Sequence, residues 1–129
     1  APPQDLSGWR NLPVSVLANK KPVALTSLAP EAMKAALDKH PYGWFPVIIQ
    51  GELKGVVNRD ALTHALAHKS EPALEPPVLF VESQTLHEAE PRLIASSSGL
   101  FLVAQAEDGP VTGVFTLHDL MRAQAALLE

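Results

Sequence analysis

The chain contains the same pattern of apolar runs twice, and this internal repeat limits the folds open to it more than any other feature. Residues 44–58 form two apolar runs around a short polar turn, and residues 100–116 repeat that arrangement. Gly55 and Gly113 hold equivalent places and set the repeat spacing at 58 residues. Self-similarity at such a spacing is typical of one supersecondary unit used twice. We therefore expect two similar units.

Each repeat is predicted to run strand, helix, strand, strand, helix. Short apolar runs favour strands, and apolar stripes at three- and four-residue spacing favour helices. In the first repeat the expected elements are a strand at Pro22–Thr26, a helix from Pro30, strands at Trp44–Ile49 and Leu53–Val57, and a helix from Arg59. In the second they are a strand at Pro77–Val81, a helix from Leu86, strands at Leu100–Gln105 and Val111–Thr116, and a helix at Leu117–Leu128.

Local signals refine one of these helices. Thr85 and Glu88 have the spacing of a capping box around the helix start at Leu86. Pro91 lies inside the same helix, where we expect it to cause a kink or an irregular turn because proline has no backbone N–H.

The expected fold class is α/β (α+β), with two βαββα repeats packed with pseudo-two-fold symmetry. The first repeat is predicted at residues 14–70 and the second at residues 71–129. Residues 1–13 begin with a proline-rich stretch and are predicted to be a linker or N-terminal extension, as in a piece of a larger protein.

Composition excludes several kinds of site and partner. The net charge of −4 argues against nucleic acid as a partner, since phosphate backbones require basic patches. The sequence has no cysteine, so it has no disulfide, thiolate nucleophile or cysteine-based zinc site. No apolar stretch approaches the roughly 20 residues that a membrane-spanning helix needs. No nucleophile motif, paired-acid motif or dinucleotide loop is present, so we expect no enzyme activity.

Two motifs resemble those of the CBS (Bateman) family. Gly113–Leu120 reads Gly-apolar-apolar-Thr-x-x-Asp at the end of a hairpin, and Phe45–Ile49 is similar to the family's apolar-Pro-Val-Val strand. The resemblance covers roughly Val14–Leu128. Within the family, Tyr42–Val47 and Thr116–Gln124 are similar to segments of the CBS pairs attached to bacterial chloride channels.

The resemblance implies an adenosine nucleotide (ATP, ADP or AMP) as a regulatory ligand in a cleft between the repeats, with no required cofactor. Asp119 can accept from both ribose hydroxyls, while the Thr116 hydroxyl and the helix-start amides can donate to phosphate. Tyr42 can cover one face of adenine. The residues that the resemblance assigns to nucleotide binding are Thr26, Tyr42, Gly43, Phe45, Pro46, Thr116, His118 and Asp119.

The corresponding motif in the first repeat is incomplete. Asn58 takes the place of Thr116, and Ala61 takes the place of Asp119. Asp60 comes one residue early, which turns its side chain about 100° around the helix. We therefore expect one competent site at most.

Plainer interpretations stand beside these assignments. Thr116 and Asp119 also have the spacing of a capping box, which needs no ligand. Tyr42 is more often a packing residue than a ligand contact. His64 and His68 have the i, i+4 spacing of metal ligands but are more often a solvated face, so no metal site is expected. The Ser96–Gly99 loop lacks the Lys and second Gly of a phosphate-binding P-loop.

The resulting functional prediction is a regulatory module of a chloride channel or transporter, at the cytoplasmic face of the membrane. Its expected partners are an adenosine nucleotide, a membrane-embedded channel domain outside this chain, and a second copy in a homodimer. The alternative is a ligand-free CBS dimerisation module attached to another transporter or an enzyme.

Overall fold

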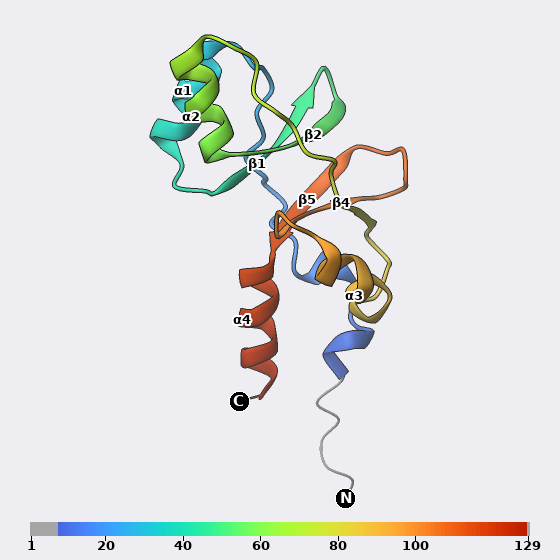
Figure 1. Cartoon of the computed structure of the whole chain (residues 1–129). Helices are drawn as coiled ribbons and strands as arrows, with labels where there is room; N and C mark the ends of the chain where they lie inside the picture. The colour runs from blue at the N-terminus through green and yellow to red at the C-terminus, as the bar shows by residue number, and fades with distance from the viewer. Residues whose placement is uncertain (1–7, 129) are drawn as a thin grey trace, which may run out of the picture. The chain divides into compact units, whose positions relative to one another are not determined.

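The computed structural model describes residues 8–128 and divides into two compact units. Unit 1 combines the N-terminal segment up to Pro22 with the residues from Val78 onward, whereas unit 2 is the continuous stretch Val23–Pro77. Both units contain helices and β-strands (Figure 1). The predicted mixed α/β class is therefore confirmed.

Unit 2 consists of a hairpin and two helices. Its elements are α1 (Pro30–Lys39), β1 (Trp44–Ile49), β2 (Glu52–Asn58) and α2 (Arg59–His68). Strands β1 and β2 are antiparallel, and the turn between them uses positive φ at Gln50 and Gly51. The buried core of the unit contains Leu25, Met33, Ala36, Phe45, Val47, Val57, Leu62 and Ala65.

The strand predicted at Pro22–Thr26 is reduced to a single bridge. Leu25 pairs in parallel with Val47, and its N–H donates to the Pro46 carbonyl at 2.8 Å. The Leu25 carbonyl in turn accepts from the N–H of Ile48 at 2.9 Å. The segment thus adds one bridge, with its two hydrogen bonds, to the hairpin.

Unit 1 has a three-stranded sheet in the order β3-β4-β5. Its elements are η1 (Gly8–Asn11), η2 (Val14–Val16), β3 (Leu79–Val81), α3 (Leu86–Ala95), β4 (Leu100–Ala104), β5 (Val111–Thr116) and α4 (Leu117–Leu128). Strand β4 is parallel to β3 and antiparallel to β5. Three buried rings, those of Phe80, Phe101 and Phe115, pack with centroids 5.1–6.2 Å apart in the core.

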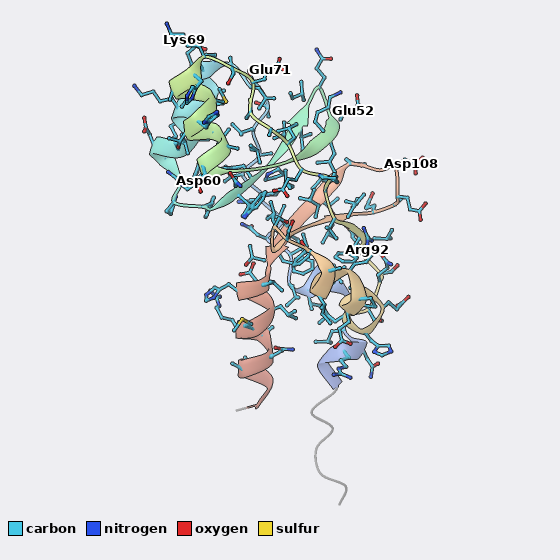
Figure 2. All side chains as sticks on the ribbon, in the orientation of Figure 1. Glu52, Asp60, Lys69, Glu71, Arg92 and Asp108 are labelled. Atoms are coloured by element: carbon cyan, nitrogen blue, oxygen red, sulfur yellow. The ribbon has the colours of Figure 1, made fainter. Side chains whose placement is uncertain are left out.

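Polar side chains cover the free edge of β3. Arg92, labelled in Figure 2, donates to the Leu79 carbonyl at 2.7 Å and lies 4.8 Å from the centre of the Phe80 ring. The Gln84 side chain accepts from the Val81 N–H at 2.7 Å. An edge strand whose backbone groups are occupied in this way is protected against pairing with another chain.

Helix α3 runs from Leu86 to Ala95 without interruption at Pro91. Because proline has no N–H, the carbonyl of His87, four residues earlier, lacks its usual helical donor. Both Pro91 and His87 are exposed. Solvent near that carbonyl limits the cost of the missing bond, and the capping box of Thr85 and Glu88, confirmed with both hydrogen bonds, secures the first turn.

The N-terminal segment belongs to unit 1, which differs from the predicted boundaries at residues 14–70 and 71–129. Val14 is fully buried in the core of unit 1, and its N–H donates to the Gln84 carbonyl at 2.7 Å. In the stretch predicted as a linker, η1 lies against α3, and Arg10 forms an ion pair with Glu90 at 3.6 Å. The first seven residues of that predicted linker lie outside the described residues.

A close backbone approach explains the repeated glycine. A Cβ at Gly55 would lie 2.7 Å from the carbonyl oxygen of Glu75, and φ there is +153°. A Cβ at Gly113 would lie 2.7 Å from the Cβ of Ala18. In each unit a segment distant in sequence therefore pairs closely beside the second hairpin strand, where only a glycine leaves it room.

Candidate functional site

The predicted ribose and phosphate residues lie at the start of α4. The Thr116 hydroxyl accepts from the Asp119 N–H at 3.2 Å, and the Asp119 carboxylate accepts from the Thr116 N–H at 2.9 Å. This reciprocal pair is a capping box, so the plainer interpretation of the motif is confirmed. The Oδ2 atom of Asp119 accepts this bond, and carboxylate oxygens have further lone pairs for a second donor.

The same helix start presents other groups to solvent. His118 is exposed, while Thr116 and Asp119 are half-buried. The Leu117 N–H donates to the carbonyl of Gly99 at 3.1 Å, so the serine-rich loop ends beside this helix start. Gly99 has φ +68°, and a side chain there would meet Leu117. The first turn of α4 therefore combines a carboxylate, a hydroxyl and an imidazole.

In unit 2, the predicted base-binding residues Tyr42 and Gly43 lie on the loop between α1 and β1. Tyr42 is 47% exposed, and its ring stacks on that of His40 with centroids 5.4 Å apart and an angle of 7° between the rings. Its other ring neighbour is Phe45, at 6.1 Å. No atom lies within 4 Å of a Cβ built on Gly43. The loop thus offers a flat, accessible aromatic surface.

Arg59 fixes this loop, a role that the sequence analysis did not identify. Its guanidinium donates to the carbonyls of Leu37 at 2.9 Å, His40 at 2.6 Å and Tyr42 at 3.2 Å. Its backbone N–H donates to the Gly43 carbonyl at 3.0 Å. A charged donor at the end of α1 satisfies carbonyls that the helix itself leaves unpaired. Arg59 is therefore engaged with backbone and is a structural cation.

Thr26 is exposed and lines a cavity of about 170 Å³ within unit 2. The cavity lies between the Val23–Thr26 segment and α1, and Lys39 and His40 also line it. Its remaining wall consists of small and aliphatic side chains, Val23, Ala24, Leu25, Ala32, Ala35 and Ala36.

Two of the predicted binding residues are buried. The Phe45 side chain is fully buried in the core of unit 2, so its ring is not exposed, and its contribution to ligand binding stays a prediction. Pro46 is also buried, and its carbonyl is already bonded to the Leu25 N–H. The apolar pattern of this strand therefore matches its burial, since Phe45, Pro46 and Val47 are consecutive buried residues of β1.

The matching helix start in unit 2 has a weaker cap. The Asn58 side chain accepts from the Ala61 N–H at 2.7 Å, as Thr116 does from Asp119. Ala61 provides no carboxylate in return, and Asp60, labelled in Figure 2, is exposed in the first turn of α2. The chemical asymmetry between the two motifs is therefore present in the structure.

Two further properties concern the described part of the chain. Among residues 8–128, no three His, Asp or Glu side chains gather into a group that could enclose a metal ion. Within the same residues, no helix combines the length and apolarity required to cross a bilayer.

Comparison with known proteins identifies the fold. Residues 73–126 match the family model described as "CBS domain". No curated protein is detectably similar in sequence. Among solved structures, the CBS domain of a putative transporter from Clostridium difficile 630 matches with a TM-score of 0.76 and 19% identity, covering 92% of this chain and 97% of that one.

Two similar structures contain a nucleotide. The CBS domain of the bacterial CNNM/CorC family Mg²⁺ transporter in complex with ATP has a TM-score of 0.76 and 19% identity, and covers 91% of this chain and 89% of that one. CBSX2 in complex with AMP has a TM-score of 0.69 and 20% identity, and covers 92% of this chain and 99% of that one. The chain thus has the fold of these CBS-domain structures, and residues 73–126 match the CBS domain family itself.

Proposed function

We propose that the chain is a non-catalytic regulatory module that binds an adenosine nucleotide and belongs to a membrane transport protein. The observation that carries the proposal is the α4 start, where the carboxylate of Asp119 and the hydroxyl of Thr116 lie together at a helix N-terminus. Carboxylate oxygens accept hydrogen bonds from ribose hydroxyls, and the free N–H groups at a helix start donate to phosphate oxygens. The AMP and ATP complexes of two similar structures support this ligand class.

Base recognition is proposed for the α1–β1 loop of unit 2. Tyr42 is 47% exposed, and one face of its ring stacks on His40, so a purine would stack on the exposed part of the ring. Gly43 leaves space beside it, and Thr26 supplies an exposed hydroxyl. The contribution of these residues and of Thr116, His118 and Asp119 to one ligand stays a prediction from family resemblance.

The parent protein is proposed to be a chloride channel or a related transporter. The motif at Thr116–Gln124 supports the channel, while two of the similar structures come from proteins named as transporters. In such a protein, a nucleotide shifts the equilibrium between two conformations only to the extent that it binds one conformation more tightly than the other. The module would act at the cytoplasmic face of the membrane.

A thermal-shift series with AMP, ADP and ATP tests nucleotide binding. At about 100 times the Kd, a ligand should add about 2.7 kcal/mol to the stability of the chain. Asp119→Ala should abolish the shift, because it removes the ribose acceptor. A chain that shows no shift with any of the three nucleotides is not a nucleotide sensor.

Glu88→Ala is the matched control for Asp119→Ala. Both substitutions remove the carboxylate of a capping box in unit 1, one on α3 and one on α4. Each should lower the stability of the free protein, because each removes the acceptor of the backbone N–H at the helix start. Only Asp119→Ala should remove the response to nucleotide. An equal response in both variants would place the ligand elsewhere.

A ligand-free dimerisation module is the second candidate, and α4 supports it. Leu117 and Met121 are four residues apart on this helix and are 40% and 64% exposed. Exposed apolar residues on one helix face are typical of a partner surface. Light scattering distinguishes the candidates: a dimer that Met121→Glu dissociates supports dimerisation through α4, and a strict monomer rules it out.

A further inference from the structure

Helix α2 carries two imidazoles one turn apart on one face. His64 and His68 are both exposed, and their rings lie with centroids 4.0 Å apart and 28° between their planes. Nothing in the proposed nucleotide function uses this pair. The rings are held face to face on the outside of unit 2, at a helix end that Lys69 terminates in the left-handed conformation.

A hydrogen bond orients one ring of the pair. The Nδ1 atom of His68 lies 2.9 Å from the carbonyl oxygen of His64. A carbonyl can only accept, so Nδ1 carries the proton, and Nε2 of His68 is left with its lone pair directed away from the backbone. Histidines that bind metals in proteins are oriented by such a bond from the other ring nitrogen. His68 thus has the arrangement of a metal ligand before any metal arrives.

The ring spacing suits one ion shared by both residues. A metal–imidazole bond is about 2.0–2.1 Å long, so two nitrogens on one tetrahedral or square-planar ion lie about 3–3.4 Å apart. The ring centroids are 4.0 Å apart, and rotation of the His64 side chain can turn a ring nitrogen toward Nε2 of His68 while His68 keeps its bond to the backbone. The His64 side chain is exposed, so its rotation displaces only water. Water molecules can complete the coordination.

We propose that His64 and His68 form a surface binding site for a single late transition-metal ion, with Cu²⁺ bound more tightly than Ni²⁺ or Zn²⁺. Neutral imidazole suits these ions, and their affinities at nitrogen sites rise toward Cu²⁺. The adjacent Lys69, labelled in Figure 2 at the end of α2, is exposed. Its flexible side chain can point away from the ion. A bound ion would join residues one turn apart and stabilise the end of α2.

Metal titration of the chelator-treated chain tests the site. Calorimetry with CuCl₂, NiCl₂ and ZnCl₂ should give one ion per chain, and the melting temperature should rise with ion concentration because the ion binds the folded helix. His64→Ala and His68→Ala should each weaken binding about tenfold or more. Alanine favours helix, so both variants should fold.

His87→Ala is the matched control, because His87 is an exposed histidine on α3 in the other unit. It should bind the ion as the unchanged chain does. Imidazole NMR signals of the unchanged chain give a second measurement: Cu²⁺ should broaden those of His64 and His68 first. Unaltered affinity in His68→Ala, or first broadening at another histidine, would overturn the proposal.

Discussion

Single residues control the helix starts, and Glu88 is the one whose ionisation bears on stability. Hydrogen bonds from the Thr85 backbone N–H and hydroxyl, both at 3.0 Å, lower the pKa of Glu88 from its ordinary value of 4.5. Since the folded-state pKa lies below the unfolded one, the stabilising contribution is present above about pH 4.5. It is lost as the pH falls through the folded-state value.

Glu88→Gln should therefore lower the free energy of unfolding at about pH 7, and this deficit should be smaller at about pH 3, because protonation of Glu88 below its ordinary pKa removes the advantage of the carboxylate. Urea unfolding at the two pH values measures the difference. Glu71→Gln, on an exposed loop position in unit 2, is the control and should differ little from the unchanged chain at either pH. A Glu88→Gln deficit of the same size at both pH values would contradict this account.

Both capping boxes were predictable from spacing, because a cap involves residues three apart and depends on local geometry. Whether Thr116 and Asp119 also contact a ligand was not predictable in the same way, since one pair of residue types serves both purposes. Phe45 illustrates the opposite case. The family motif that contains Phe45 suggested ligand binding, whereas its ring is fully buried and packs in the core of unit 2.

At the scale of elements, Arg59 connects the end of α1 to the start of α2. Its guanidinium donates to three carbonyls, those of Leu37, His40 and Tyr42. Arg59→Met keeps the apolar stem and removes the donors. It should lower the free energy of unfolding by about 2 kcal/mol, the scale of hydrogen bonds to a charged group.

Arg122→Met is the control for this prediction, because Arg122 is exposed on α4. It should change the free energy of unfolding by less than about 0.5 kcal/mol. Urea unfolding of the two variants gives the comparison. Equal stability of Arg59→Met and the unchanged chain would mean that water replaces the guanidinium at the loop carbonyls without cost.

Helices and hairpins followed the sequence patterns more closely than isolated strands did. Both hairpins are present, because each is local and has a polar turn. The strand predicted at Pro22–Thr26 became one bridge at Leu25, since the extent of a strand depends on a partner from elsewhere in the chain. Pro91 was expected to disturb α3, and the helix nevertheless continues through it at an exposed position.

At the scale of the whole molecule, the two units are completed in the same way. In unit 2 the backbone of Val56 exchanges hydrogen bonds with Glu75. In unit 1 the backbone of Val114 exchanges hydrogen bonds with Asn19. Each hairpin is therefore extended by a segment that pairs with the residue after its repeated glycine, Gly55 or Gly113. Periodicity could not predict this pairing, because it joins residues about 95 positions apart in unit 1.

This pairing predicts that the N-terminal segment is part of unit 1 and not a removable linker. A chain of residues 23–128 lacks Val14, which is fully buried in the core, and Asn19, which bonds to Val114 at 2.7 and 3.1 Å. We expect unit 1 of this chain to lose hydrogen-exchange protection in β5, while unit 2 keeps the protection of β1 and β2. A chain of residues 8–128 is the control and should protect both units. In the full chain, Val14→Ala should selectively weaken unit 1 by about 2 kcal/mol. Undiminished protection of the Val114 amide in the chain of residues 23–128 would show that unit 1 folds without the segment, because that amide donates to the Asn19 carbonyl.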